Sequence, residues 1–209
     1  MHLSEGVLSV PVLAGGAVLA AAGVGIGLKR LEPERIAGAG LLAAGFFVAS
    51  LIHVPIGPSS AHLVLNGLVG LILGWTAFPV ILVALVLQGV FLQFGGITTL
   101  GVNTVVMALP AVAMHYACKP FVRQKTITGR VAAFGCGAGA IGGGAVLVAL
   151  ALVTTGQHFV HAAGLILAAH LPVMVVEGLV TLFCVGFLQK VMPEMLPGQQ
   201  QPHRPMEQG

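Results

Sequence analysis

Apolar residues fill most of the chain in long runs, and within these runs apolar and polar positions do not alternate. A helix that crosses a bilayer needs about 20 predominantly apolar residues, whereas the strands of a membrane barrel alternate between the two faces. Since the runs are rich in Ala, Val, Leu and Gly, we predict an all-α polytopic membrane protein. Seven transmembrane helices are expected at about residues 10–28, 36–54, 62–74, 79–94, 101–118, 130–155 and 167–189.

Composition excludes most other classes of protein. Of the 209 residues, 57% are hydrophobic and only 7% are charged, against about 25% charged residues in a soluble domain. So few charges cannot build a surface that faces water, which excludes a soluble enzyme and a disordered chain. The nine Lys and Arg are also too few and too scattered to follow a phosphate backbone. We expect lipid around the protein and no nucleic-acid partner.

The basic residues predict the orientation in the membrane. They follow the first helix, lie between the fifth and sixth, or follow the seventh. With seven helices and an external N-terminus, all nine fall on the cytoplasmic side, as the positive-inside rule requires. One helix over 62–94 would separate them, so we expect a break before Pro79, which suits the first turn of a helix. The nine are Lys29, Arg30, Arg35, Lys119, Arg123, Lys125, Arg130, Lys190 and Arg204.

The ends of the chain and the short third helix have their own predictions. Glu5 precedes the first apolar run and positive charges follow it, which favours an uncleaved helix over a signal peptide. Residues 1–192 are expected to form one domain in the cell inner membrane, and 193–209 a disordered cytoplasmic tail. The third helix is only about 20 Å long, against a hydrocarbon core of about 30 Å. The segment 55–62 is therefore expected to dip into the membrane from outside.

Histidine is the ionisable residue that stands out. The chain has eight His and no Asp, and this orientation places five of the eight on the outer side, where no Lys or Arg lies. Surroundings rich in imidazole and free of cations suit a divalent transition metal, although His is also common at membrane interfaces. His158 and His161 share one helical face and form a second metal site, a surface pair or a binding point on the entry path of the metal. The outer residues are Met1, His2, Glu5, His53, His62, His158 and His161.

His2 has a special position because it follows the first residue. A free terminal amine, the amide of His2 and its Nδ1 can form fused chelate rings in one plane when the metal displaces the amide proton. One further imidazole would complete four nitrogens, a set that suits Ni(II) or Cu(II). His62, at the mouth of the short helix, is predicted to supply that fourth nitrogen.

Glu177 lies near the middle of the last helix, where a carboxylate is costly and is usually functional or paired. It shares a helical face with His170, so it could belong to an ion pathway or be a hydrogen-bonded structural residue. Gly135, Gly139 and Gly143 recur every four residues and predict close helix packing. The same stretch spells GxGxxG, but no strand precedes it, so a dinucleotide site is excluded. No nucleophile or nucleotide motif is present, and we expect no enzyme.

Four ordered motifs resemble one family. MHLSEG at residues 1–6, GPSSAHL at 57–63, GGITTLGVN at 95–103 and the last-helix residues His170-Leu171-Pro172 with Glu177-Gly178 resemble the CbiM/NikM proteins. These are the substrate-binding (S) components of cobalt and nickel energy-coupling-factor transporters. The resemblance covers nearly all of the chain to about residue 195. The sequence departs from the family pattern at its start, and it lacks the Gly-Asp that often precedes the two glycines.

The resemblance implies a seven-helix fold with an external N-terminus. It implies metal held by the Met1 amine, the His2 amide and imidazole, and a loop histidine matching His62. Ni2+ or Co2+ would be the transported substrate, without an organic cofactor. It also implies a membrane coupling (T) subunit, cytoplasmic ATP-binding subunits and possible association with a small accessory membrane subunit. The residues expected around the site or along its pathway are Ser60, Thr98, Asn103, His53 and Glu177.

One alternative function remains open at this point. A stand-alone secondary transporter or channel for a divalent cation would use Glu177 and His170 as a relay across the membrane. The choice between nickel and cobalt also remains open, because the resemblance implies the same ligands for both metals.

Overall fold

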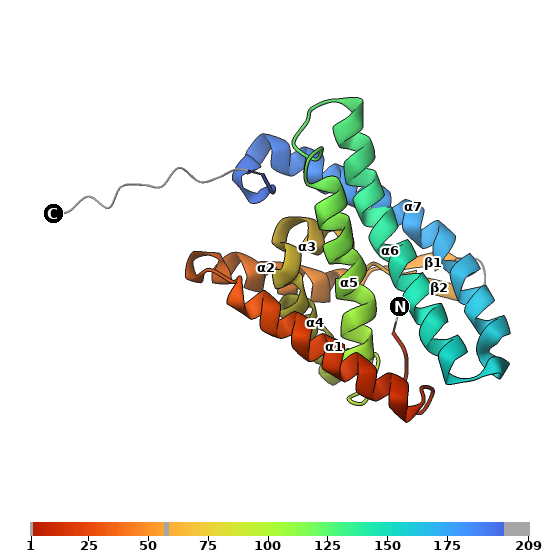
Figure 1. Cartoon of the computed structure of the whole chain (residues 1–209). Helices are drawn as coiled ribbons and strands as arrows, with labels where there is room; N and C mark the ends of the chain where they lie inside the picture. The colour runs from red at the N-terminus through yellow and green to blue at the C-terminus, as the bar shows by residue number, and fades with distance from the viewer. Residues whose placement is uncertain (1, 57–58, 199–209) are drawn as a thin grey trace.

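The structure, a computed structural model, describes residues 2–56 and 59–198, with the backbone alone for 53–61. Long helices dominate it (Figure 1). The α-helices are α1 (Val10–Lys29), α2 (Ile36–Ala49), α3 (Asn66–Leu73), α4 (Ala77–Leu92), α5 (Leu100–Cys118), α6 (Ile127–Thr155) and α7 (Val160–Val191). Strands β1 (His53–Ile56) and β2 (Ser59–His62) and the 3-10 helices η1 (Pro33–Arg35), η2 (Gly74–Thr76), η3 (Gln157–Phe159) and η4 (Pro193–Met195) complete it.

The prediction of an all-α membrane protein is confirmed, with about five to six helical spans. Within residues 2–56 and 59–198, five segments are long and apolar enough to cross a bilayer: α1, Asn66–Leu92, α5, α6 and Gln157–Val191. Helix α2 is shorter, at 14 residues or roughly 21 Å. Helix α3 has only eight residues, or roughly 12 Å. The third helix, which was expected at residues 62–74 and already judged too short to span, is therefore shorter than predicted.

The break predicted before Pro79 lies at η2. Gly74 ends α3 with a φ of +56°, a conformation that glycine adopts readily because it has no Cβ. A Cβ on Gly70 would contact Ala111 and one on Gly74 would contact His115, so α3 runs alongside α5 in the same direction. Helix α4 then runs back toward the start of α5, and the chain reverses at η2.

The segment between α2 and α3 is a β-hairpin in the described residues, where irregular backbone was predicted. His53 pairs with His62 and Ile56 with Ser59 in an antiparallel register. Helix α2 ends at Ala49 rather than at residue 54. Helix α3 begins at Asn66 rather than at residue 62, because Leu65 before it has a φ of +58° and cannot continue a right-handed helix.

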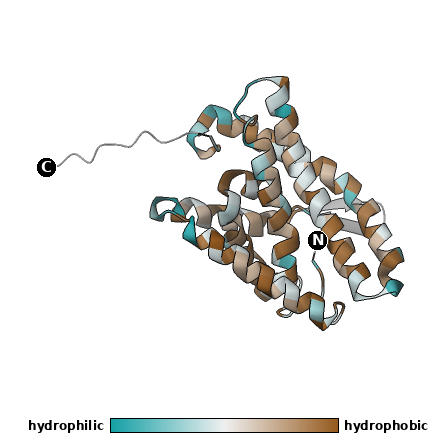
Figure 2. Ribbon diagram, in the orientation of Figure 1, coloured by the Kyte–Doolittle hydropathy of each residue, from teal (hydrophilic) through white to brown (hydrophobic). Residues whose placement is uncertain are grey.

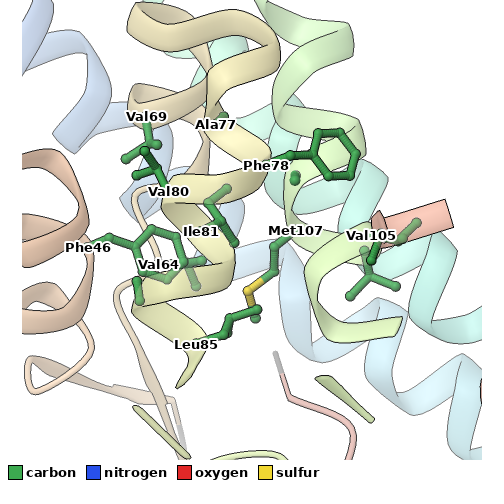
Figure 3. Packing of buried hydrophobic residues seen from close by; sticks show 14 of the residues in the cluster. Phe46, Val64, Val69, Ala77, Phe78, Val80, Ile81, Leu85, Val105 and Met107 are labelled. Atoms are coloured by element: carbon green, nitrogen blue, oxygen red, sulfur yellow. The ribbon is translucent and has the colours of Figure 1, made fainter. Parts of the chain in front are cut away.

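The buried core lies between α2, α3, α4 and α5. Figure 3 shows Phe46, Val64, Ile81 and Met107 converging there from different elements. Large apolar side chains also cover the outside of the long helices, as lipid contact requires. Figure 2 shows these outer stretches in brown and the turn between α1 and α2 in teal. Among the exposed residues are Leu19, Val90, Phe183 and Phe187.

The predicted glycine stripe on α6 packs largely inside the bundle. A Cβ on Gly139 would meet the Met114 side chain at 2.7 Å, and one on Gly143 would meet Pro110 Cβ at 2.9 Å. Helix α6 therefore lies close against α5 along two members of the stripe. Gly135 has nothing within 4 Å of its Cβ position and takes no part in this contact.

The described part of the chain continues for six residues past 192, where the membrane domain was predicted to end. Helix η4 follows α7, and Leu196 is buried against the inner cluster of Val122 and Val185. Arg123 Nη1 donates hydrogen bonds to the carbonyls of Pro193, at 3.0 Å, and Leu196, at 3.1 Å. The remainder of the predicted tail, residues 199–209, lies outside the described residues.

Candidate metal centre

The N-terminal segment is docked between α4 and α5 by a side-chain amide. The Leu3 amide donates to Asn103 Oδ1 at 2.9 Å, and Asn103 Nδ2 donates back to the Leu3 carbonyl at 3.1 Å. Asn103 Nδ2 also donates to Thr99 Oγ1 at 3.2 Å, which fixes the orientation of the amide. Leu3 is buried beneath this pair. Residue 2 is therefore held at a defined position against the bundle.

Two glycines make room for this segment. Gly95 has a φ of +79°, and its Cβ would lie 3.0 Å from Asn103 Nδ2. A Cβ on Gly96 would collide with the Glu5 side chain. Glu5 accepts hydrogen bonds from the Thr98 amide at 3.0 Å and the Thr98 hydroxyl at 2.9 Å. These bonds from Thr98 lower the pKa of the Glu5 carboxyl and fasten the N-terminal segment to the loop before α5.

The two predicted histidine ligands meet at this point. His2 Nδ1 lies 3.2 Å from His62 Nε2, and their ring centroids are 5.1 Å apart. Phe94 stacks on the His62 ring with centroids 5.5 Å apart and planes 14° apart. The same phenyl ring lies 5.5 Å from the His2 ring, so Phe94 supports both imidazoles from one side.

Each imidazole ring makes one hydrogen bond to the rest of the protein, and these bonds determine which ring nitrogens carry the proton. His2 Nε2 lies 2.8 Å from Gln88 Oε1, an acceptor, so His2 carries its proton on Nε2. His62 Nδ1 donates to the Leu63 carbonyl at 3.0 Å. The nitrogens that face each other, His2 Nδ1 and His62 Nε2, then both present lone pairs. Metal-bound imidazoles in proteins are held in this way by an acceptor on the far nitrogen.

Burial keeps the His2 ring neutral. Loss of hydration is the largest effect that lowers the pKa of His2, to about 3; neighbouring positive charge and His62 act in the same direction, and the Gln88 hydrogen bond opposes them. Metal ions bind the neutral imidazole. The docked segment thus presents His2 in the protonation state that a metal requires.

The docking of His2 is expected to weaken in acid. A pKa lowered in the docked state means that the undocked state binds the proton more tightly. Docking is therefore fully stable above pH 6.5, which is the ordinary pKa of histidine, and loses stability as the pH falls from 6.5 toward 3. Histidine NMR of the metal-free protein should show the His2 ring neutral at pH 6. A His2 ring that titrates near 6.5 while it remains docked would contradict this expectation.

Glu177 is hydrogen-bonded to the turn beside the candidate site. Its carboxylate accepts hydrogen bonds from the amides of Val64 and Leu65, and it is fully buried. These amides belong to the turn directly after His62, so Glu177 positions that histidine. His170 Nδ1 bonds to the Ile166 carbonyl of its own helix. His170 and Glu177, which were predicted to share a helical face, have no hydrogen bond to each other in the described part of the chain.

Some of the remaining predicted residues lie at the N-terminal segment, and others lie outside the described part of the chain. Thr98 and Asn103 hold the N-terminal segment, as described above. Met1 lies outside the described residues, and so do the side chains of His53 and Ser60. His158 packs on Phe159 with ring centroids 4.2 Å apart. Over residues 2–56 and 59–198, no three His, Cys, Asp or Glu side chains lie close enough together to hold a metal ion.

Sequence analysis did not identify Gln88 and Phe94, and it gave Glu5 no role in the site. Gln88 is fully buried, and its presence in the apolar run of α4 was the available signal. A hollow of about 560 Å³ opens beside His2 and is lined by Glu5, Phe94 and Asn103 among others. Glu5 is the acidic residue among those that line this hollow.

The helices define a polytopic integral membrane protein, and the docked N-terminal segment gives it a pair of imidazoles suited to a transition metal. Sequence comparison then identifies the family. The profile of the CbiM family, described as "Cobalt uptake substrate-specific transmembrane region", matches residues 2–195. The chain belongs to the CbiM family. It is thus a transport component rather than an enzyme, and the family implies cobalt or nickel as the transported substrate.

Relatives and solved structures agree with this assignment. A relative from Haemophilus influenzae is 45% identical over 199 residues, covering 94% of this chain and 97% of its own. The "Fused nickel transport protein NikMN" of Rhodobacter capsulatus is 33% identical over 235 residues, covering 98% of this chain and 66% of that protein. The crystal structure of a truncated transition metal transporter superposes with a TM-score of 0.72 at 22% identity, over 91% of this chain and 99% of that one.

Proposed function

We propose that this protein is the substrate-binding component of an ATP-driven transporter that imports Ni(II) or Co(II), and that its N-terminus holds the metal. The observation that carries the proposal is the approach of His2 Nδ1 to His62 Nε2 at 3.2 Å. Their hydrogen bonds to Gln88 and Leu63 aim both lone pairs at a common position.

This separation suits two neighbouring ligands of one metal ion. With metal–nitrogen bonds of about 2.0–2.1 Å, two nitrogens at right angles lie roughly 2.8–3.0 Å apart. The His2 amide and the Met1 amine would supply the other two nitrogens of a square plane, a geometry typical of Ni(II). The proposal therefore requires that Met1 carry a free amine. Because two of the four proposed nitrogens belong to the main chain, such a site does not need three clustered side-chain ligands.

The orientation follows from the placement of the basic residues. Arg30 Nη1 donates to Tyr116 Oη at 3.1 Å, which brings the ends of α1 and α5 together. Arg123 reaches the chain after α7. The basic residues of 2–198 thus gather at one end of the bundle, and His2 lies toward the other. By the positive-inside rule we assign the basic end to the cytoplasm and the N-terminus to the outside of the inner membrane.

Seven passages through the membrane follow if α3 is counted with the β-hairpin. The hairpin and α3 together would form one passage, in which the hairpin enters from outside and α3 completes the path to the basic end. Backbone of this kind is tolerated at membrane depth where it is enclosed by protein, and Glu177 satisfies two of its amides.

Transport would require further subunits. The fused NikMN relative implies partner transporter subunits, and we propose a membrane coupling subunit, cytoplasmic ATP-binding subunits and a small accessory membrane subunit. The test is metal uptake into liposomes by this chain alone and by the chain with these subunits. ATP-dependent uptake that needs the partners is expected. Uptake by the chain alone, without ATP, would instead favour the stand-alone transporter or channel.

Gln88 offers a sharper test of the binding site. Gln88→Leu removes the acceptor that fixes the His2 ring, and loss of such a partner typically lowers metal affinity about 10–100-fold. The fold should tolerate the change, because Gln88 Nε2 is buried without a hydrogen-bond partner and leucine has no such group to satisfy. Calorimetric titration with Ni(II) measures the affinity, and thermal unfolding of the metal-free variant is the control. Unchanged affinity in a folded variant would contradict the assigned role.

A further inference from the structure

A second hollow lies at the basic end of the bundle, away from His2. It measures about 660 Å³ and is formed by the start of α6 and the end of α7. Three of the residues that line it are cations, Lys125, Arg130 and Lys190, and none is acidic. Its other walls are mostly apolar, with Leu182 and Phe183 among them.

The charged and apolar parts of this hollow lie at different depths. Lys125 precedes α6, Arg130 lies in its first turn and Lys190 lies in the last turn of α7. Phe183 is seven residues before Lys190, roughly 10 Å along the helix, and is exposed on the outer surface of the bundle. The hollow is therefore cationic where the helices end and apolar toward the middle of the membrane.

We propose that this hollow, named here the α6–α7 groove, binds one anionic phospholipid. The three cations would hold the phosphate, and an acyl chain would lie along Leu182 and Phe183. Basic pockets between membrane helices commonly bind acidic headgroups. A free phosphate would leave the apolar half of the groove without a contact. A phospholipid without net charge would not balance the charge of the three cations.

Gly186 keeps the groove open. It lines the hollow, and nothing lies within 4 Å of the position its Cβ would take. Because α7 has ordinary helical backbone at this point, a larger residue should fold normally and occupy the space of the acyl chain. Gly186→Leu is therefore a steric test that leaves all three cations in place.

The experiment is native mass spectrometry of the purified full chain after exchange into a mixture of phosphatidylglycerol and phosphatidylcholine. The wild-type chain should retain phosphatidylglycerol several-fold in preference. Replacing Lys125, Arg130 and Lys190 with Gln should abolish the preference, and Gly186→Leu should reduce the retained adduct several-fold. Lys29→Gln removes one cation from the last turn of α1 at the same end of the bundle and should have little effect.

Ni(II) titration of each variant checks the fold, since the groove is separate from His2. Equal retention of the two lipids by the wild-type chain would overturn the proposal. A loss of retained phosphatidylglycerol in Lys29→Gln as large as the loss in Lys190→Gln would also overturn it. Displacement of the lipid adduct by glycerol phosphate would do the same. Loss of a partner subunit from the triple variant with unchanged lipid adducts would assign the groove to protein contact instead.

Discussion

His2→Ala should abolish tight binding of Ni(II) and Co(II). The substitution removes the Nδ1 that lies 3.2 Å from His62 Nε2 and, with it, the proposed chelate ring between the imidazole and the amide of the same residue. Since loss of an outer-shell partner alone costs 10–100-fold, loss of this ligand should cost at least about 100-fold. The measurement is calorimetric titration of the purified chain, together with metal analysis after desalting.

His161→Ala is the matched control, because it removes an imidazole at the start of α7 that is not part of the proposed site. Leu3 and Asn103 should still dock the N-terminal segment in the His2 variant, since their hydrogen bonds involve the Leu3 backbone. Retained tight binding by His2→Ala, or an equal loss in His161→Ala, would show that the metal lies elsewhere.

Glu177→Ala should destabilise the protein more than any other single change near the site. It leaves the buried amides of Val64 and Leu65 without their acceptor, and each unmade buried hydrogen bond costs about 1–3 kcal/mol. The turn that follows His62 would loosen, so metal affinity should fall together with stability. Thermal unfolding of the metal-free protein in detergent measures the first effect and Ni(II) titration the second.

Glu177→Gln separates this structural role from that of an ion relay. Its amide oxygen can still accept from the turn, but its amide nitrogen cannot, so stability and affinity should fall between those of wild type and Glu177→Ala. A relay predicts a different result, with normal stability and metal binding but lost transport. That combination would contradict the positioning role.

Hydropathy predicted most of the helical structure because a segment in lipid must satisfy its own backbone hydrogen bonds, which a long apolar helix does. The helix expected at 101–118 is α5, Leu100–Cys118, and the helix expected at 10–28 is α1, Val10–Lys29. The break before Pro79 was found because a single helix would have separated the basic clusters. The third helix was expected to fall short of a full span, and α3 is shorter still, because Leu65 and Gly74 at its two ends have positive φ.

The site was predictable where local chain chemistry defines it. The position of His2 at the second residue and of His62 beside the short third helix singled out these two residues, and the structure brings their rings together. The chelate itself stays a prediction. The roles of Gln88 and Glu177 depend on contacts between residues far apart in the chain. Gln88 meets His2 across 86 positions and Glu177 meets Val64 across 113. No local pattern encodes such contacts, and an isolated polar residue in an apolar run shows only that some partner exists.

The most direct test of the central claim is Ni(II) titration of a chain with one alanine inserted before Met1, with intact mass confirming the new terminus. The insertion leaves His2, His62 and every described hydrogen bond available. It displaces the free amine from the chelate, so tight Ni(II) binding should be lost while the metal-free protein keeps its thermal stability. An extended chain that binds Ni(II) as tightly as the wild type would contradict a metal centre built on the N-terminus.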